Sequence, residues 1–194
     1  MNRNLRHLVL AIFLPIHFWA QESAKYAGEN ASYFRAEELY EKAQFNSAKQ
    51  EFRTFINGSK ESKRNPNDPF IVKAYYYEGI SALELYNNDA IPLLDAFNKA
   101  YPDNIYKNKI ALKIGNFHFQ KEDFESAQIA YAKVPVREVE SDEKEEVLFK
   151  MGYSAFQNGD FESSYDAFRD VKDGTTQYAK PSLYFYSHIS YTKN

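Results

Sequence analysis

The stretch EDFESAQIAYAKV (residues 122–134) recurs 37 residues later as GDFESSYDAFRDV (residues 159–171), and this repetition decides the fold. Six of the thirteen aligned positions are identical. The segments just before them also match, ALKIGNFHF (111–119) with LFKMGYSAF (148–156), which aligns Gly115 with Gly152. A period of this size is typical of a chain built from repeated supersecondary units.

Two weaker copies precede this pair and a partial copy follows it. The first keeps Ala36 and the second keeps Gly79 at the register position of Gly115, while LYFYSHISY (183–191) has Ser187 there. We therefore expect repeats at about 27–57, 69–101, 103–136 and 141–173, with a partial unit at 176–193. The polar segment NGSKESKRNPNDP (57–69) is predicted to be a loop between the first two repeats.

Each unit reads as two helices. Apolar or small residues recur at steps of three and four, as in Leu148, Met151 and Ala155, which is the spacing of one helix face. Polar breakers such as NGD (158–160) separate the two halves. No alternating strand pattern bounded by hairpin turns stands out. The sequence predicts an all-α chain of about four helix pairs and a final unpaired helix.

This pattern resembles the tetratricopeptide repeat (TPR) family, whose unit is a helix–turn–helix of 34 residues. In that family, small residues occupy positions 8 and 20 of each repeat, and an aromatic residue occupies position 24. The corresponding residues here are Ala36, Gly79, Gly115, Gly152 and Ser187 at position 8, Ala48, Ala90, Ala127 and Ser164 at position 20, and Phe52, Leu94, Tyr131 and Phe168 at position 24. The resemblance covers nearly all of residues 27–193. It implies a right-handed superhelical solenoid of antiparallel helix pairs, in which small residues let two helices approach closely and the large residue at position 24 fills the space beside them.

The resemblance also implies a concave groove lined by the first helix of each pair. Its candidate residues stand at positions 5, 9 and 12 and are mostly aromatic: Tyr33, Tyr40, Tyr76, Leu83, Asn116, Phe119, Tyr153, Phe156 and Tyr184. Flat, rigid rings of this kind suit a partner peptide or helix. The alternative is that some of these rings pack as core between repeats. A second set of rings is predicted to pack within the fold: Phe45, Phe52, Phe124, Tyr131, Phe161 and Phe168.

The composition excludes several classes of protein. The chain has 194 residues with 24 Lys+Arg against 27 Asp+Glu, and this balance does not suit nucleic-acid binding. The lack of cysteine excludes disulfides, thiolate catalysis and cysteine-based metal sites. Aromatic residues make up 17% of the chain against only 7 Gly and 7 Pro, which indicates a packed core rather than disorder.

No catalytic, cofactor or metal site is expected, and no small-molecule substrate. After residue 20 the only histidines are His118 and His188, in different repeats and without a nearby Ser–Asp arrangement. HExxH and DxDxDG patterns are absent. The acidic run REVESDEKEE (137–146) lacks the turn glycine of a calcium loop, so we interpret it as a solvated helix start.

Residues 1–20 predict export. Arg3 and Arg6 precede an apolar run from Leu8 to Trp19, and Ala20 offers a cleavage position, which is the layout of a secretory signal peptide. The run is too short for a comfortable membrane span. A buried N-terminal helix or a short anchor is the alternative. Residues 21–194 contain no further apolar stretch of membrane length, so we expect a periplasmic or outer-envelope protein of a Gram-negative bacterium.

Together, these features predict a non-enzymatic protein–protein interaction scaffold that binds a peptide or helix in the aromatic groove. One alternative is a structural module that self-associates through its last helix, because the apolar face of that helix (Leu183, Tyr186 and Ser187) is expected to lack a second helix to cover it. Another is an N-terminal docking segment of a longer protein. A third, an enzyme built from helical hairpins, would need paired carboxylates that converge in a pocket.

Overall fold

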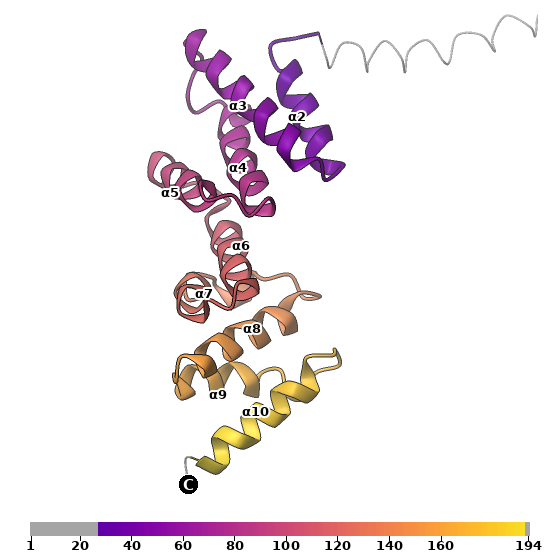
Figure 1. Ribbon diagram of the computed structural model, residues 1–194, viewed down its shortest axis with the longest axis vertical. Coiled ribbons are helices and arrows are strands. Elements are labelled where there is room, and N and C mark those ends of the chain that lie inside the picture. Colours follow the sequence, from indigo (N-terminus) through magenta and orange to yellow (C-terminus); the bar gives the residue numbers. More distant parts are fainter. Residues whose placement is uncertain (1–26, 193–194) are drawn as a thin grey trace, which may run out of the picture. The chain divides into compact units, whose positions relative to one another are not determined.

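The computed structural model describes residues 27–192, and all regular structure within this range is helical (Figure 1). The all-α prediction is therefore confirmed for these residues, while the predicted signal peptide lies outside them. The chain divides into two compact units, residues 1–97 and residues 98–194. In the described part, no helix is both long and apolar enough to cross a membrane.

The first unit contains α2 (Ala31–Glu41), α3 (Phe45–Glu61), α4 (Pro69–Glu84) and most of α5 (Ala90–Ala100), within which the unit boundary falls. Helix α3 packs against both α2 and α4. The core between these three helices combines large rings with small residues, which allows close packing. Its buried members are Tyr33, Ala36, Ala48, Phe52, Phe55, Ile56, Ile71 and Ala74.

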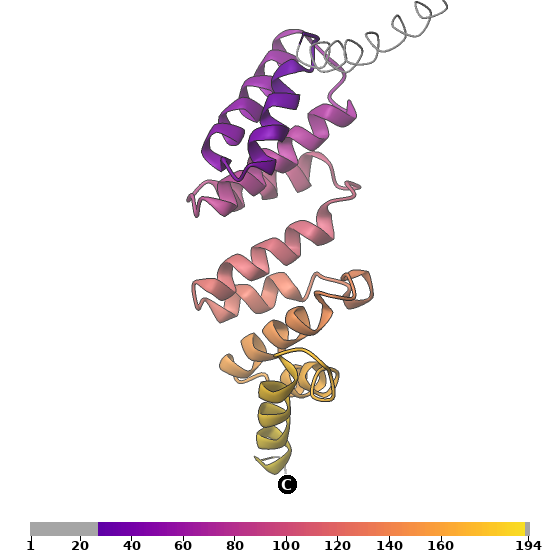
Figure 2. The same cartoon turned by 90° about the vertical axis from the view of Figure 1, so that its right-hand side faces the viewer.

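The second unit contains α6 (Lys107–Gln120), α7 (Phe124–Tyr131), the short 3₁₀ helix η1 (Val136–Glu138), α8 (Lys144–Gln157), α9 (Phe161–Arg169) and α10 (Ala179–Thr192). Each helix from α6 to α10 packs against the next, and α6 also contacts α8. Figure 2 shows the α6–α7 and α8–α9 hairpins one after the other, followed by α10.

The repeated DFES motif marks the start of the second helix in two pairs. The Asp123 carboxylate accepts a hydrogen bond from the Ser126 backbone N–H at 3.2 Å, and Asp160 accepts one from Ser163 at 3.1 Å. These aspartates are N-caps, which satisfy an amide that the helix itself leaves unpaired. The hydrogen bonds from the serines hold the pKa of both carboxyl groups below its usual value. The motif that decides the fold is thus a helix-start signal.

Three glycines at the predicted position 8 lie against the residues predicted for position 24, in the pairs Gly79–Leu94, Gly115–Tyr131 and Gly152–Phe168. A Cβ atom placed on Gly115 would lie 2.5 Å from Cδ1 of the Tyr131 ring. A Cβ on Gly152 would lie 3.1 Å from Phe168. The predicted contact between a small residue and a large one is confirmed in these pairs, because only the missing side chain makes room for its partner.

The backbone conformation of the turn inside each helix pair is the same in all four pairs, although the residue type at this position differs. Ala43, Tyr86, Glu122 and Gly159 follow the first helices and have φ values of 55°, 55°, 57° and 76°. This left-handed conformation ends a helix and reverses the chain, and glycine adopts it at least cost. Only the last of the four turns has glycine, so residue identity alone does not reveal the shared turn.

The predicted loop over residues 57–69 is wrong at both ends, because α3 continues to Glu61 and α4 begins at Pro69. The extra turn is stabilised by packing, since Phe55, Ile56 and Ser59 are all buried. The Arg64 guanidinium also lies 5.3 Å from the centroid of the Phe55 ring. Burial of one helix face thus outweighs the polar composition of the segment.

The predicted packing set is confirmed in part. Phe52, Tyr131 and Phe168 are fully buried, and Phe45 and Phe124 are partly buried. The prediction is wrong for Phe161, which is 47% exposed at the first position of α9 and touches the Phe156 ring at a centroid distance of 5.6 Å.

Candidate partner-binding surface

The first unit buries three of its four predicted groove residues. Tyr33, Tyr76 and Leu83 retain 1%, 4% and 4% of their exposed surface. The fourth, Tyr40, is partly buried and packs against Tyr77 at a ring-centroid distance of 4.7 Å. The prediction that Tyr33, Tyr76 and Leu83 line an open groove is wrong, because a buried side chain has no surface to offer a partner.

Polar groups around Tyr33 pair with one another. The Tyr33 hydroxyl donates to Glu37 at 3.0 Å, and the Lys73 ammonium donates to the same carboxylate oxygen at 2.8 Å. The Lys73 ammonium also lies 5.8 Å from the centroid of the Tyr33 ring. Burial raises the pKa of the Tyr33 phenol, and it raises that of Tyr40 to about 12. These groups hold α2 to α4.

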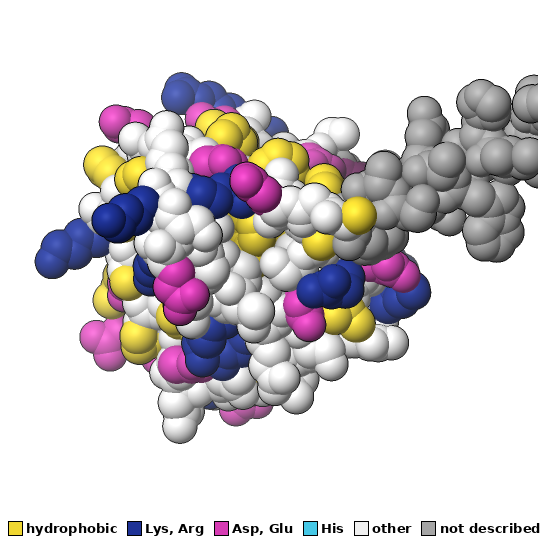
Figure 3. All heavy atoms as spheres, turned by 90° about the horizontal axis from the view of Figure 1, so that it is seen from above, with side chains coloured by type: hydrophobic (Ala, Val, Ile, Leu, Met, Phe, Trp, Pro, Cys, Tyr) yellow, Lys and Arg dark blue, Asp and Glu magenta, His cyan; other side chains and the backbone are white. Residues whose placement is uncertain are grey.

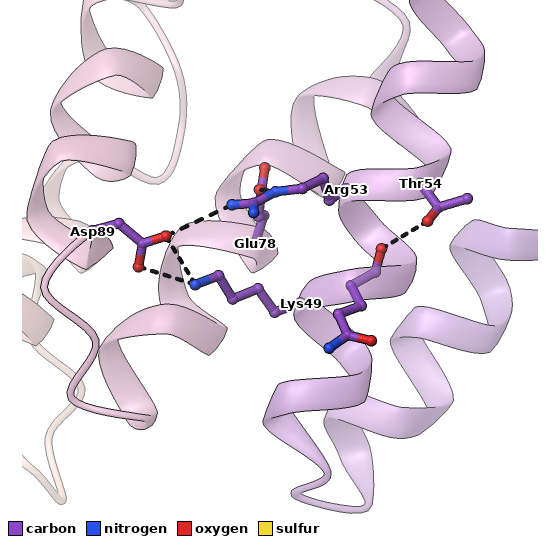
Figure 4. Close-up of polar contacts among 6 residues, drawn as sticks. Lys49, Arg53, Thr54, Glu78 and Asp89 are labelled. Carbon is purple, nitrogen blue, oxygen red and sulfur yellow. Dashed lines mark hydrogen bonds and ion pairs between the residues drawn. The ribbon is translucent and has the colours of Figure 1, made fainter.

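A second polar network joins α3 to α4 and to the start of α5 (Figure 4). The Lys49 ammonium donates to both oxygens of Asp89 at 2.9 Å, and this contact lowers the pKa of the Asp89 carboxyl group. Arg53 donates to the buried carboxylate of Glu78 at 2.6 Å and lies 3.7 Å from Asp89. The two buried charges, Lys49 and Glu78, are each paired with a half-exposed partner of opposite sign, as a buried charge requires. The network therefore stabilises the helix packing.

Charges of both signs are also mixed on the molecular surface. On the face shown in Figure 3, Lys and Arg side chains lie among Asp and Glu side chains. This mixture accords with the small net charge of −3.

In the second unit, the structure brings four predicted groove rings together. We call this the aromatic row: Phe119, Tyr153, Phe156 and Tyr184, with Phe185 and His188 joining them. Its members come from α6 and α8, the first helices of two successive pairs, and from the final helix α10. Phe119, Tyr153 and Phe156 are partly buried, and Tyr184 is 67% exposed. The row therefore retains accessible surface.

The inner part of the row is held by edge and tilted ring contacts. Phe119 meets Tyr153 at a centroid distance of 5.9 Å, and Tyr153 meets Phe185 at 5.5 Å. Phe185 then meets Phe156 at 4.9 Å. These distances and angles are in the favourable range for aromatic pairs. The rings of α6, α8 and α10 thus fix one another in place.

The outer part of the row is more open. The His188 ring lies 6.0 Å from Phe156 and is stacked on Tyr184 at 6.3 Å with an interplanar angle of 9°. Both His188 and Tyr184 are exposed. A partner that approaches this end would therefore meet the exposed parts of these two rings.

Asn116 forms a polar edge beside the row. Its side-chain oxygen accepts hydrogen bonds from the Tyr131 hydroxyl at 2.8 Å and from the Lys150 ammonium at 3.3 Å. Lys150 also lies 5.8 Å from the Phe119 ring centroid and pairs with Glu146, which lowers the pKa of that carboxyl group. This edge of the row therefore offers the hydrogen-bonded amide of Asn116 and the Lys150 ammonium, which lies near the Phe119 ring.

Sequence reasoning missed two rings that support the row. Phe149 stands at position 5 of the fourth repeat, and its ring is stacked on Tyr153 at 5.9 Å. The repeat register could have identified it. Phe185 follows Tyr184 in the sequence and is stacked on Phe168 at 5.1 Å. Its role follows only from how α10 packs against α9.

A cavity of about 440 Å³ lies next to Asn116, and we call it the α6 cavity. One wall is α6 and the other is the connection between α7 and α8, which contains η1. The lining residues are Ile105, Asn108, Lys109, Leu112, Lys113, Asn116, Val134, Glu138, Val139, Glu140 and Glu143.

The outward face of α10 exposes large apolar side chains. Leu183 and Tyr191 are 48% and 85% exposed. The sequence predicted an uncovered face that included Leu183, Tyr186 and Ser187, and this is wrong for Tyr186. Its ring is stacked on Tyr165 of α9 at 4.6 Å, and the two hydroxyl groups lie 2.8 Å apart.

The two histidines occupy separate surroundings. His118 Nδ1 lies 2.9 Å from the Asp123 carboxylate at the end of α6, while His188 belongs to the aromatic row. Within residues 27–192, no three side chains of His, Asp or Glu gather as potential metal ligands.

No protein-family model matches this chain, and no curated protein matches it.

Proposed function

We propose that this chain is a TPR-like helical-repeat scaffold whose second unit binds a peptide or helix of a partner protein along the aromatic row. The observation that carries this proposal is the set of ring contacts that links α6, α8 and α10 while Tyr184 stays 67% exposed. Tyrosine and phenylalanine offer a large contact area at a small entropic cost, which makes them frequent anchors of interfaces.

The solenoid architecture is supported by the repeated local structure. The small-to-large contacts between the helices of three pairs and the left-handed turn in four pairs are what a stack of equivalent units requires. An exported location is supported by the signal-like sequence of residues 1–20. A non-enzymatic role is supported by the pairing of His118 with a helix-capping carboxylate and the placement of His188 against a ring.

Selection of peptides from a random display library against the purified chain tests the proposal. The affinity of each selected peptide, measured by fluorescence polarisation, should fall about tenfold or more in Tyr153→Ala and Tyr184→Ala, as for an interface anchor. Ile129→Ala is the matched control, because Ile129 is 57% exposed on α7 and does not belong to the row.

Two results would contradict the proposal. One is a failure to select any peptide, and the other is selected peptides that bind the two row variants as well as they bind the wild type. Light scattering over a range of concentrations addresses self-association. A mass that rises with concentration and returns to the monomer value in Leu183→Glu would favour that alternative.

A further inference from the structure

The α6 cavity has an apolar floor. Val134 is buried there, and Leu112 and Val139 are partly buried. A volume of about 440 Å³ lies within the usual range of ligand pockets and holds one or two large side chains. The floor therefore suits an apolar side chain of a bound segment.

Charges on the two walls of the cavity differ in sign. On the connection side, the Asn108 amide donates to Glu138 at 2.5 Å, which leaves that carboxylate partly satisfied. The carboxylates of Glu140 and Glu143 have no ion pair or hydrogen bond to any other side chain of residues 27–192. The α6 wall carries two cations, Lys109 and Lys113, and the Lys109 ammonium has no such contact within the same range. The connection thus presents two unpaired anions.

The cavity and the aromatic row share one face of α6. Lys109, Leu112, Asn116 and Phe119 follow one another at steps of three and four residues, which places their side chains along one stripe. Asn116 lines the cavity and stands beside Phe119, the first ring of the row. The row crosses from α6 to α8 and α10, while this stripe runs along α6, so a bound segment would pass from the row to the cavity by turning along α6 at Phe119.

We propose that the α6 cavity is the terminal subsite of the aromatic row and takes a basic peptide segment. An apolar side chain of the segment lies on Leu112 and Val139, and an adjacent Lys or Arg faces Glu140 and Glu143. This rests on the proposed function, since the segment belongs to the partner that binds the row. Lys109 repels a second cation on the α6 side and so sets the direction of the peptide.

The test uses peptides selected on the full chain and a neutral counterpart of each, with norleucine in place of Lys and citrulline in place of Arg. Selected peptides should be enriched in Lys or Arg next to an apolar residue. The double variant Glu140→Gln/Glu143→Gln should bind the basic peptide about tenfold more weakly at low salt. It should bind the neutral counterpart as the wild type does.

The matched control is Glu125→Gln/Glu162→Gln, which removes the same charge from exposed positions in the first turns of α7 and α9. It should leave both affinities unchanged. Tyr184→Ala should weaken binding of the basic and neutral peptides to the same extent.

Equal binding of the basic peptide by wild type and Glu140→Gln/Glu143→Gln overturns the subsite. If Tyr184→Ala still weakens binding in that case, the proposed function stands. If the control double variant loses as much affinity as the cavity variant, the effect is one of net charge and the subsite is again overturned. If Tyr184→Ala also has no effect, the proposed function fails with it.

Discussion

Tyr33 in the first unit and Tyr184 in the second hold the same register position in their repeats, yet Tyr33 is 1% exposed and Tyr184 67% exposed. The Tyr33 ring is enclosed by the rings of Phe52, Phe55 and Phe70, from α3 and α4, at centroid distances of 5.0–5.9 Å. Helix α10, which bears Tyr184, packs against α9. The number of neighbouring helices, rather than the register position, decides whether such a ring becomes core.

Both units join successive first helices through a lysine, but the group that accepts its hydrogen bond differs between them. Glu37 and Asn116 occupy position 9 of their repeats, and each bonds to a lysine on the first helix of the next pair. In the first unit this is the ion pair with Lys73, and in the second it is an amide oxygen that accepts from Lys150. Position 9 therefore ties successive first helices together in both units.

The largest difference between the units should appear when the two tyrosines are truncated. Tyr33→Ala should lower the free energy of unfolding by about 3–5 kcal/mol, because it leaves a cavity in a closed core. Tyr184→Ala should change it by ~0.5 kcal/mol or less, since the ring is largely in water already. Urea denaturation followed by circular dichroism measures both.

Tyr33→Phe is the control for the first variant. It keeps the ring and loses the hydroxyl that donates to Glu37, so it should cost about 1 kcal/mol. If Tyr33→Ala and Tyr184→Ala lowered the free energy of unfolding by similar amounts, the two positions would contribute equally to stability and the proposed difference between the units would be wrong.

A smaller difference in stability is expected when the glycines at the helix contacts, Gly79 in the first unit and Gly115 in the second, are replaced by alanine. A Cβ atom on Gly79 would lie 2.5 Å from a terminal methyl group of Leu94, and one on Gly115 would lie 2.5 Å from the Tyr131 ring. Gly115→Ala should cost about 1–3 kcal/mol, because a buried ring cannot turn aside without moving its helix. Gly79→Ala should cost less, since the Leu94 side chain, whose Cγ would lie 2.8 Å away, can adjust its rotamer more easily than a rigid ring can.

The melting temperatures of the two alanine variants provide this measurement. Gly58→Ala serves as the reference, because nothing lies within 4 Å of a Cβ atom at that exposed position of α3. If Gly79→Ala lowered the melting temperature more than Gly115→Ala does, the interpretation of Tyr131 as the more rigid neighbour would be wrong.

The smallest expected effect is a loss of stability of the first unit at alkaline pH. Burial raises the pKa of Tyr40 from 10.0 to about 12, so the folded state favours the neutral phenol. This contribution to stability is complete below about pH 10 and is lost as the pH rises towards 12, because the unfolded chain releases its proton first. The urea midpoint should therefore decrease as the pH is raised from 10 to about 12.

Tyr40→Phe should reduce this fall without abolishing it, since burial also raises the pKa of Tyr33 and Tyr131. A fall that is identical in Tyr40→Phe and the wild type would show that Tyr40 does not contribute to it.

The sequence predicted the local elements well because their signals are local. The polar breaker at residues 158–160 predicts the separation of two helices, and the close approach at Gly115 and Gly152 follows from the repeat register. The end of α3 at Glu61 was missed, because its helicity depends on burial against a neighbouring helix rather than on the polar residues themselves.

The candidate site was less predictable. Of the rings assigned to a groove, Tyr33 and Tyr76 are core, while Phe119, Tyr153 and Tyr184 lie in a row with accessible surface. Periodicity places all five on one side of their helices, but it does not say how many other helices cover that side.

By itself, the sequence determined that this chain folds as successive helix pairs with small residues where two helices cross, because helix starts and close contacts depend on residues a few positions apart. The tertiary structure alone decided three things: which tyrosines are core, that Phe185 joins the aromatic row, and that the connection before α8 closes a cavity against α6. Burial is a property of all the neighbours of a side chain, and most of those neighbours are distant in sequence.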